Sequence, residues 1–352
     1  MGSILDADLD DLEALVVTRE LLGLIAKVDE LKGRWSALGT LAPERLGALK
    51  KVATIESVGS STRIEGATLS DVEVGRLLRG LDVRSFRSRD EEEVAGYARA
   101  MELVFDSYTE MPLTENLIKH LHQVLLQFAS KDRRHRGEYK KLPNDVQAFG
   151  PDGTPIGVVF RTATPFSTPR RMQALTSTTA AALADGRDHP LLVIGVFVLR
   201  FLAIHPFQDG NGRLSRILTT LLLLRAGYLY VPYSSLERVI EENKEGYYLA
   251  LRHAQHDRGR LGEWLVFFLR ALRRQQEVLV TRVERERLMD PMPELQERLL
   301  ALAREHGRLT VRAATAALEA NRETVKANIG KLVDKRLLVL RGKGKGAWYE
   351  PA

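Results

Sequence analysis

A long apolar stretch, a short polar loop and a second, leucine-rich stretch follow one another in the middle of the chain. Residues 191–204 carry Arg200 as their only charge, and residues 214–224 are again largely apolar. An all-round apolar helix of this length is buried and is too short to span a membrane. Pro206 disfavours helix at the residue before it. The pattern therefore predicts two buried core helices joined by a polar loop, with His205 at the end of the first helix, facing a cleft.

The polar loop combines groups that suit phosphate chemistry. His205 can accept a proton at neutral pH, and Asp209 is a hard oxygen ligand of the kind that Mg²⁺ prefers. Glycines allow a tight turn close to a ligand, and the free N–H groups that open the second helix favour an anion. Arg213 and Arg216 can bind phosphate oxygens. Taken singly, the histidine would favour a core or capping role and the aspartate a turn or helix-capping carboxylate.

Residues 205–216 together read H-P-F-Q-D-G-N-G-R-L-S-R and match H-x-F-x-[D/E]-G-N-G-R-x-x-R at every fixed position. The segment resembles the signature of the Fic family, whose members move AMP from ATP to a protein hydroxyl. The resemblance implies that His205 is the general base, that Asp209 holds Mg²⁺, and that ATP is the substrate. It further implies a nucleotide-binding set made of Gly210, Asn211, Gly212, Arg213, Leu214, Ser215 and Arg216.

The resemblance leaves the reaction open. We expect transfer of AMP to a Ser, Thr or Tyr hydroxyl of another protein or of the chain itself. One alternative is transfer of a different nucleotidyl or phosphoryl group, and another is removal of AMP from a modified protein. A third is a DNA-binding transcription regulator whose Fic domain senses a nucleotide. The chain lacks G-x-x-x-x-G-K-[S/T], which argues against a P-loop NTPase.

A second motif, Ser61 to Gly66, resembles the inhibitory segment [S/T]-x-x-x-E-[G/N] of Fic proteins. The resemblance implies that Glu65 takes the charge-assisted hydrogen bonds of Arg216 that the ATP γ-phosphate needs; Ser61 and Gly66 are the other two fixed positions of the motif, and Ser61 is assigned to the inhibitory site with Glu65. A purely structural interpretation makes Gly66 the residue that ends a helix and Glu65 a solvated carboxylate in its last turn.

Two further segments are candidates for binding. Residues 155–165 are rich in β-formers and bounded by prolines, which predicts a hairpin. The resemblance implies that this hairpin is a flap that positions the target chain by strand addition through Val158, Val159 and Phe160; a structural hairpin is the alternative. Tyr248 is expected to contact adenosine, although an aromatic residue buried on an amphipathic helix fits the pattern as well.

The C-terminal residues 294–352 differ from the rest in charge. They contain 12 Lys and Arg against 7 Asp and Glu, a balance of +5 within a chain of +6. Helices are expected over 294–305, over 309–318 and after a cap at Asn321, followed by strands at 337–340 and 347–350. This order is typical of a winged helix-turn-helix. Basic residues on its third helix and wing suit DNA phosphates. The alternative is that this domain contacts another protein or packs in a dimer, with a basic face that keeps it soluble.

The whole chain is expected to be mainly α, with a Fic-type helical core, a β-hairpin flap and the C-terminal winged helix. The expected domains are an N-terminal helical region with the inhibitory helix (1–110), the catalytic core (111–288) and the winged helix (294–352). Further core helices are expected over 113–128, 172–184, 237–256 and 261–283. With no cysteines there is no disulfide framework, and no N-terminal signal pattern is present. We therefore expect a cytoplasmic protein with no membrane partner; a homodimer is left open.

Overall fold

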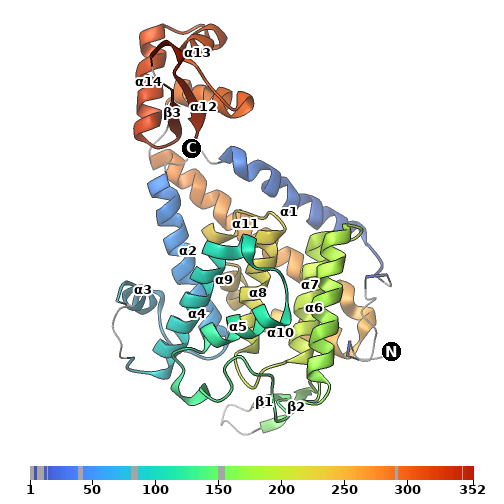
Figure 1. Ribbon diagram of the computed structural model, residues 1–352. Coiled ribbons are helices and arrows are strands. Elements are labelled where there is room, and N and C mark those ends of the chain that lie inside the picture. The colour runs from blue at the N-terminus through green and yellow to red at the C-terminus, as the bar shows by residue number, and fades with distance from the viewer. Residues whose placement is uncertain are drawn as a thin grey trace. The chain divides into compact units, whose positions relative to one another are not determined.

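A computed structural model describes most of the 352 residues. The described residues are 4–5, 12–13, 15–38, 43–80, 86–149, 155–289, 292–342 and 344–352. The helices are α1 (Arg19–Leu38), α2 (Pro43–Ile64), α3 (Asp71–Arg79), α4 (Arg89–Ser107), α5 (Glu115–Leu125), α6 (Thr168–Asp185), α7 (Pro190–Ile204), α8 (Asn211–Arg225), α9 (Leu236–Glu242), α10 (Lys244–His256), α11 (Leu261–Met289), α12 (Glu294–His306), α13 (Val311–Leu318) and α14 (Arg322–Asp334). The strands are β1 (Val146–Phe149), β2 (Pro155–Phe160), β3 (Leu338–Arg341) and β4 (Trp348–Pro351). The predicted mainly helical fold with a hairpin is confirmed (Figure 1).

The chain divides into two compact units. The first contains Met1–Lys32 and Val52–Gln276, and the second contains Gly33–Lys51 and Glu277–Ala352. Within the described residues, no helix combines the length and the apolar character that a membrane span requires.

Helices α7 and α8 form the core of the first unit, as predicted. Every residue of α7 from Leu191 to Ile204 is buried, and α8 is buried from Arg213 to Leu224. Pro190 is the first residue of α7, where a backbone N–H would have no partner within the helix, so proline is well tolerated there. Helices α6 and α10 pack against α7, whereas α4 and α5 pack against α8 (Figure 1). The loop between α7 and α8 is therefore held at both ends by rigid, buried helices.

Close contacts fix the surrounding helices to this core. The indole N–H of Trp264 on α11 donates to the carbonyl of Gly195 on α7 at 2.8 Å. A Cβ at Gly195 would lie 2.6 Å from the Leu265 side chain, so the approach of the two helices requires glycine there. Helix α4 begins at a Ser88 cap and α5 at a Thr114 cap, and each cap side chain accepts the backbone N–H of the third residue of its helix.

The hairpin differs from its prediction. Strand β2 pairs with β1, which lies upstream, with Val146 opposite Phe160 and Phe149 opposite Pro155. The expectation of both strands within 155–165 is therefore wrong. After β2 the chain leaves the sheet because the N–H of Thr162 donates to the side chain of Asp145 instead of to a strand.

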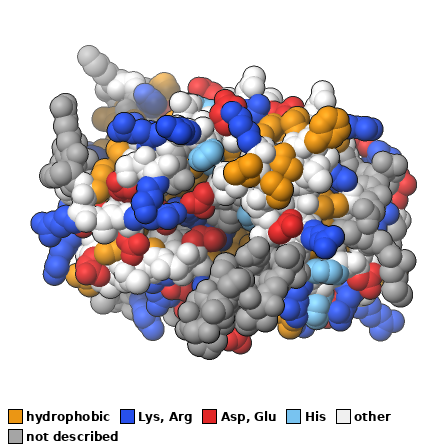
Figure 2. Space-filling model, turned by 90° about the horizontal axis from the view of Figure 1, so that it is seen from below, with side chains coloured by type: hydrophobic (Ala, Val, Ile, Leu, Met, Phe, Trp, Pro, Cys, Tyr) orange, Lys and Arg blue, Asp and Glu red, His pale blue; other side chains and the backbone are white. Residues whose placement is uncertain are grey.

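Figure 2 views the molecule from below, where acidic and basic side chains are interspersed and hydrophobic side chains gather in one patch.

The expected helix over 237–256 is divided. Asn243, with φ −130° and ψ 47°, ends α9 and precedes α10. An asparagine at such a junction is physically reasonable, because its side chain competes with the backbone for hydrogen bonds.

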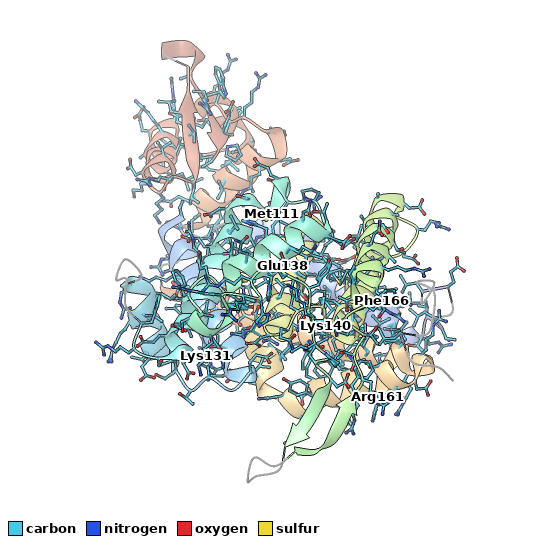
Figure 3. All side chains as sticks on the ribbon, turned by 60° about the horizontal axis from the view of Figure 1, so that its bottom comes forward. Met111, Lys131, Glu138, Lys140, Arg161 and Phe166 are labelled. Carbon is cyan, nitrogen blue, oxygen red and sulfur yellow. The ribbon has the colours of Figure 1, made fainter. Side chains whose placement is uncertain are left out.

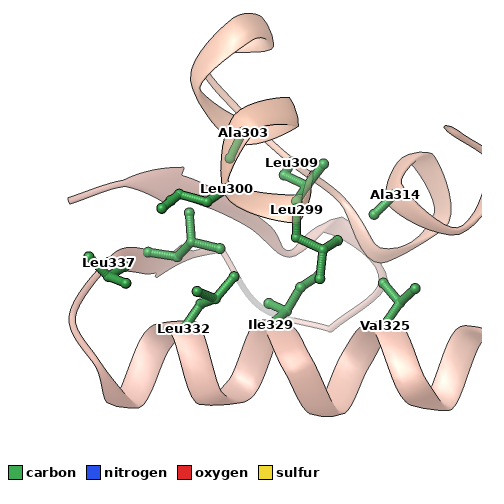
Figure 4. Packing of buried hydrophobic residues seen from close by; sticks show 10 residues of the cluster. Leu299, Leu300, Ala303, Leu309, Ala314, Val325, Ile329, Leu332 and Leu337 are labelled. Carbon is green, nitrogen blue, oxygen red and sulfur yellow. The ribbon is translucent and has the colours of Figure 1, made fainter. Parts of the chain in front are cut away.

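The C-terminal elements of the second unit follow the predicted order of three helices and a hairpin. The side chain of Asn321 accepts the N–H groups of Glu323 and Thr324, as expected of a cap. Strand β3 pairs antiparallel with β4, with Leu338 opposite Pro351. The core is aliphatic and comes from all three helices and β3 (Figure 4); it contains Leu299, Leu300, Ala303, Leu309, Ala314, Val325, Ile329, Leu332, Leu337 and Leu338. Asp290, Pro291 and Lys343 lie outside the described residues.

Candidate active site

His205 ends α7 in a conformation that is unusual for a residue with a side chain. Its backbone is left-handed, with φ 52° and ψ 60°, and its N–H donates to Phe201 O at 2.9 Å. The ring atom Nδ1 lies 3.3 Å from the carbonyl of Leu202. A carbonyl can only accept, so Nδ1 carries the hydrogen and Nε2 is left with its lone pair. Burial lowers the pKa of His205 to about 4. The imidazole is therefore neutral at pH 7 and can accept a proton at Nε2.

Asp209 lies between two arginines. Its carboxylate accepts the N–H of Gly210 at 2.6 Å and pairs with Arg213 at 3.3 Å and with Arg89 at 3.1 Å. Burial alone raises the pKa of this carboxyl, but Arg213, the Gly210 amide and Arg89 outweigh it and hold the pKa below its ordinary value. Asp209 therefore stays ionised.

The start of α8 holds a carboxylate from another part of the chain. Gly210 precedes the helix with φ 79°, and a Cβ at Gly212 would lie 2.2 Å from Glu65 Oε1. Glu65 therefore lies where the N–H groups of a helix start favour an anion. The side chain of Asn211 is used inside the loop, since it accepts the N–H of Phe207 at 2.9 Å and donates to its carbonyl at 2.7 Å.

Arg216 is buried and is bound by Ser61 in the last turn of α2 and by Glu65, which directly follows this helix. Its Nε donates to Ser61 Oγ at 2.8 Å, and Nη2 donates to Ser61 O at 2.9 Å and to Glu65 Oε1 at 2.8 Å. Although burial disfavours the charged form, the Glu65 carboxylate raises the pKa of Arg216 above its ordinary value. Glu65 is thus part of an ion pair, in contrast to the solvated carboxylate of the structural alternative. Gly66, at φ 105°, does follow the helix end.

The two arginines of the loop are held by different carboxylates. Arg213 is buried, and its Nη1 lies 2.9 Å from Glu93 Oε2 on α4. Arg216 pairs with Glu65, with Nη2 2.8 Å from Glu65 Oε1. Each guanidinium is thus already paired with a protein carboxylate, with which a phosphate oxygen would compete.

The remaining predicted site residues differ in exposure. Leu214 is fully buried, and Ser215 Oγ donates to Gly212 O at 2.7 Å. Tyr247 is buried, whereas its neighbour Tyr248 is 42% exposed, with the two ring centroids 5.3 Å apart. Tyr248 is the ring of this pair that a ligand can reach.

The flap residues are only partly described. Phe160 is 5% exposed, and its ring packs edge-on against His256 with centroids 5.5 Å apart. The side chains of Val158 and Val159 lie outside the described residues.

Polar residues outside the motif support the loop, and sequence reasoning missed them. His122 on α5 stacks on Phe207 with ring centroids 3.8 Å apart. Its Nε2 donates to Asp209 O at 3.0 Å, and its Nδ1 accepts the N–H of Gly137 at 3.0 Å. The remaining supports are Arg89 and Glu93 on α4, and Lys140 and Asn144 before β1. No local pattern marks these residues, because their partners lie more than sixty positions away.

The described residues contain no group of three or more His, Cys, Asp or Glu side chains that could hold a metal ion. Asp209 is the carboxylate of the loop itself. One protein carboxylate combined with substrate phosphates is a common arrangement for Mg²⁺. The site therefore fits this ion only together with a phosphate-bearing ligand.

The core of this chain is similar to known proteins. Residues 112–223 match the model of the Fic/DOC family. Protein adenylyltransferase Fic of Drosophila willistoni is 28% identical over 226 residues, which are 61% of this chain and 42% of that protein. The corresponding protein of Drosophila melanogaster is 28% identical over 227 residues, 61% and 43% of the two chains. This chain thus spans about two fifths of the length of these relatives.

Solved structures share the fold. A Fic family protein from Desulfovibrio desulfuricans G20 superposes with a TM-score of 0.61 at 23% identity, over 96% of this chain and 97% of that one. Fic-1 (residues 134–508) from C. elegans gives a TM-score of 0.54 at 20% identity, over 75% and 71%. These structures show that the fold is shared, and the family match covers the segment that contains α5 to most of α8. Residues 112–223 of this chain form a domain of the Fic/DOC family.

Proposed function

We propose that this chain is a self-inhibited protein adenylyltransferase, which moves AMP from ATP to a Ser, Thr or Tyr hydroxyl of a protein, including itself. The observation that carries the proposal is the position of His205: the Leu202 carbonyl sets the tautomer that leaves a lone pair on Nε2, four residues before the Asp209 carboxylate and the amides that open α8. The relatives named protein adenylyltransferase Fic support the choice of reaction.

In this reaction His205 Nε2 takes the proton of the target hydroxyl. The hydroxyl oxygen forms a bond to the α-phosphorus of ATP, the bond from that phosphorus to the bridging oxygen breaks, and pyrophosphate leaves. The amides of residues 210–213 face the charge that builds on the α-phosphate and stabilise it. Asp209, together with the phosphates, would hold Mg²⁺, which when bound neutralises phosphate charge. Tyr248, as the exposed ring, is proposed to contact adenosine, and the hairpin to position the target.

The inhibitory part of the proposal rests on the Glu65–Arg216 pair. Glu65 holds the guanidinium that would bind the γ-phosphate and also covers the start of α8. ATP would then bind with its phosphates in a non-productive position. Helix α2, with Ser61 in its last turn, would act as the inhibitory helix of an N-terminal region ending near residue 110.

For residues 294–352 we propose a winged helix-turn-helix that binds DNA. The positive balance of +5 supports it, as do Arg322 and Lys326, which are exposed on α14. A transcription regulator with a nucleotide-sensing core is therefore the second candidate function.

Intact-mass measurement tests the reaction. Wild-type protein and the Glu65→Gly variant are incubated with Mg²⁺ and each nucleoside triphosphate in turn. A gain of the mass of AMP with ATP, stronger in Glu65→Gly and absent in His205→Ala, is expected. A gain of a different group would replace the donor, and loss of AMP from a pre-modified protein would favour the reverse reaction. Unchanged masses in every sample would leave the regulator as the better proposal.

A further inference from the structure

Two residues outside the motif hold the backbone of the catalytic loop at four successive carbonyls. Lys140 and Asn144 lie in the segment between α5 and β1. Their N–H groups donate to Ile204 O (Lys140 Nζ, 3.0 Å), His205 O (Asn144 Nδ2, 3.2 Å), Pro206 O (Lys140 N, 2.8 Å) and Phe207 O (Asn144 Nδ2, 2.6 Å). The turn that aims His205 is thus held from one side by a single short segment.

The ammonium group of Lys140 is placed unusually deep for a lysine. The residue is 3% exposed and lies inside the helical unit (Figure 3). Its three N–H groups reach Asn144 Oδ1 at 2.7 Å, Thr162 Oγ1 at 2.8 Å and Ile204 O at 3.0 Å, all of them neutral oxygens. Burial without a directly bound carboxylate disfavours the charge and lowers the pKa of Lys140 to about 8. A lysine that served only as a solvated surface charge would not need its ammonium group buried among three oxygen atoms.

The loop needs such support. His205 is left-handed at φ 52°, a conformation that a residue with a Cβ keeps only when its surroundings enforce it. Ile204 O is also at the C-terminal end of α7, where the partial negative charge of the helix favours a cation. Lys140 supplies that cation directly beside the residue that turns.

We propose that Lys140 is a positioning residue for His205: with Asn144 it fixes the left-handed turn that aims the imidazole, and its positive charge adds to burial in disfavouring protonation of that ring. The inference rests on the proposed role of His205 as the base.

The charges around His205 agree with this proposal. After burial, which has the largest effect, Lys140 lowers the pKa of His205, whereas the Leu202 carbonyl, Glu65 and Asp209 raise it. Lys140 is therefore the cation that opposes the two carboxylates facing the ring from the end of α2 and from the loop.

The test compares three variants of the full chain, each also carrying Glu65→Gly so that self-modification is measurable. Lys140→Met removes charge and hydrogen bonds, and Asn144→Ala removes bonds to the loop but keeps the ammonium. Lys141→Met, at the neighbouring exposed position, removes the same charge from the surface and is the matched control. The readouts are kcat and KM for ATP, and the titration of the His205 ring followed by NMR on isotope-labelled histidine.

Lys140→Met is expected to lower kcat by roughly 10- to 100-fold with little change in KM, and to raise the pKa of His205 toward its ordinary value. Asn144→Ala should lower kcat without moving that pKa, and Lys141→Met should change neither. An unmoved His205 titration in folded Lys140→Met overturns the electrostatic part. An unchanged kcat in Asn144→Ala overturns the positioning part, even where Lys140→Met does not fold. NMR follows the His205 ring without any turnover. The effect of Lys140 on the pKa of His205 can therefore be measured even if the protein transfers no AMP.

Discussion

Glu65 and Arg216, 151 positions apart in the chain, form an ion pair of 2.8 Å in which the guanidinium is buried. The same carboxylate leaves no room for a Cβ at Gly212. One side chain therefore occupies both Arg216, for which we propose a phosphate-binding role, and the anion-favouring start of α8. In the proposed inhibited state, Glu65 thus occupies both groups that would bind the phosphates of ATP.

Replacing His205 by alanine should abolish transfer and leave ATP binding largely intact. His205 faces the hydroxyl in the proposed reaction, whereas the amides of α8 and the arginines face the phosphates. A general base contributes at least about 10²-fold. Self-modification measured by intact mass, together with calorimetric ATP binding, checks this. Transfer at the wild-type rate would remove His205 from the mechanism.

Asp209→Ala should remove the dependence of activity on Mg²⁺ along with most of the activity. Arg89 pairs with this carboxylate, so Arg89→Ala should have the opposite effect and lower the Mg²⁺ concentration needed for half-maximal rate. Titration of the rate with Mg²⁺ in both variants distinguishes them. Unaltered Mg·ATP binding and activity in Asp209→Ala would show that the metal is held elsewhere.

Stability should fall in mild acid because of His122. Burial lowers the pKa of His122 from 6.5 to about 4, so the unfolded chain binds a proton between these values that the folded chain does not. The free energy of unfolding therefore decreases as pH falls from 6.5 to 4, by up to about 1.4 kcal/mol per pH unit for one such group.

Urea unfolding of His122→Gln across this pH range measures the effect. The variant should be less stable at pH 7, because it loses the bond to Asp209 O, and its stability should depend less on pH. His120→Gln is the matched control, since His120 is exposed on the same helix. Equal pH dependence in wild type and His122→Gln would assign the acid sensitivity to other groups.

The sequence predicted the parts of the site that are local in the chain. The loop from His205 to Arg216 and the two core helices could be located because apolar runs, a proline and glycines lie next to one another there. The groups that hold the loop could not, because Arg89, His122 and Lys140 come from other elements and no pattern links them to it. The strand Val146–Phe149 was missed for a related reason: four residues carry too little periodicity to be recognised without their partner strand.

The full chain should bind duplex DNA with a steep dependence on salt. Arg322 and Lys326 are exposed on α14, and each phosphate contact contributes a slope of about −0.9 in log K against log salt. Substituting both by alanine should weaken binding and make the slope shallower by nearly two, whereas Lys141→Ala in the first unit should not. Fluorescence anisotropy from about 50 mM salt upward measures this. No binding at the lowest salt would favour a protein-contacting surface.

Glu65→Gly should raise the rate of transfer. Removing the carboxylate frees Arg216 for the γ-phosphate and clears the start of α8, so that ATP can extend with its α-phosphorus open to in-line attack. A hydrogen bond to a charged group contributes about 1.5–3 kcal/mol, so release should give roughly 10- to 100-fold more activity. If Glu65 instead takes part in removing AMP, the substitution should slow that reverse reaction.

The double-mutant cycle of Glu65→Gly with Arg216→Ala shows whether the arginine transmits the effect. If the carboxylate inhibits by holding this guanidinium, the gain from Glu65→Gly should vanish when Arg216 is absent, because there is no longer a group to release. Ser61→Ala offers a graded comparison: it removes one of the bonds that hold Arg216 in place while the ion pair remains, so a smaller gain is expected. Self-modification rates of these proteins, at one ATP and Mg²⁺ concentration, decide the matter. A gain of equal size with and without Arg216 would mean that Glu65 acts through the start of α8 alone.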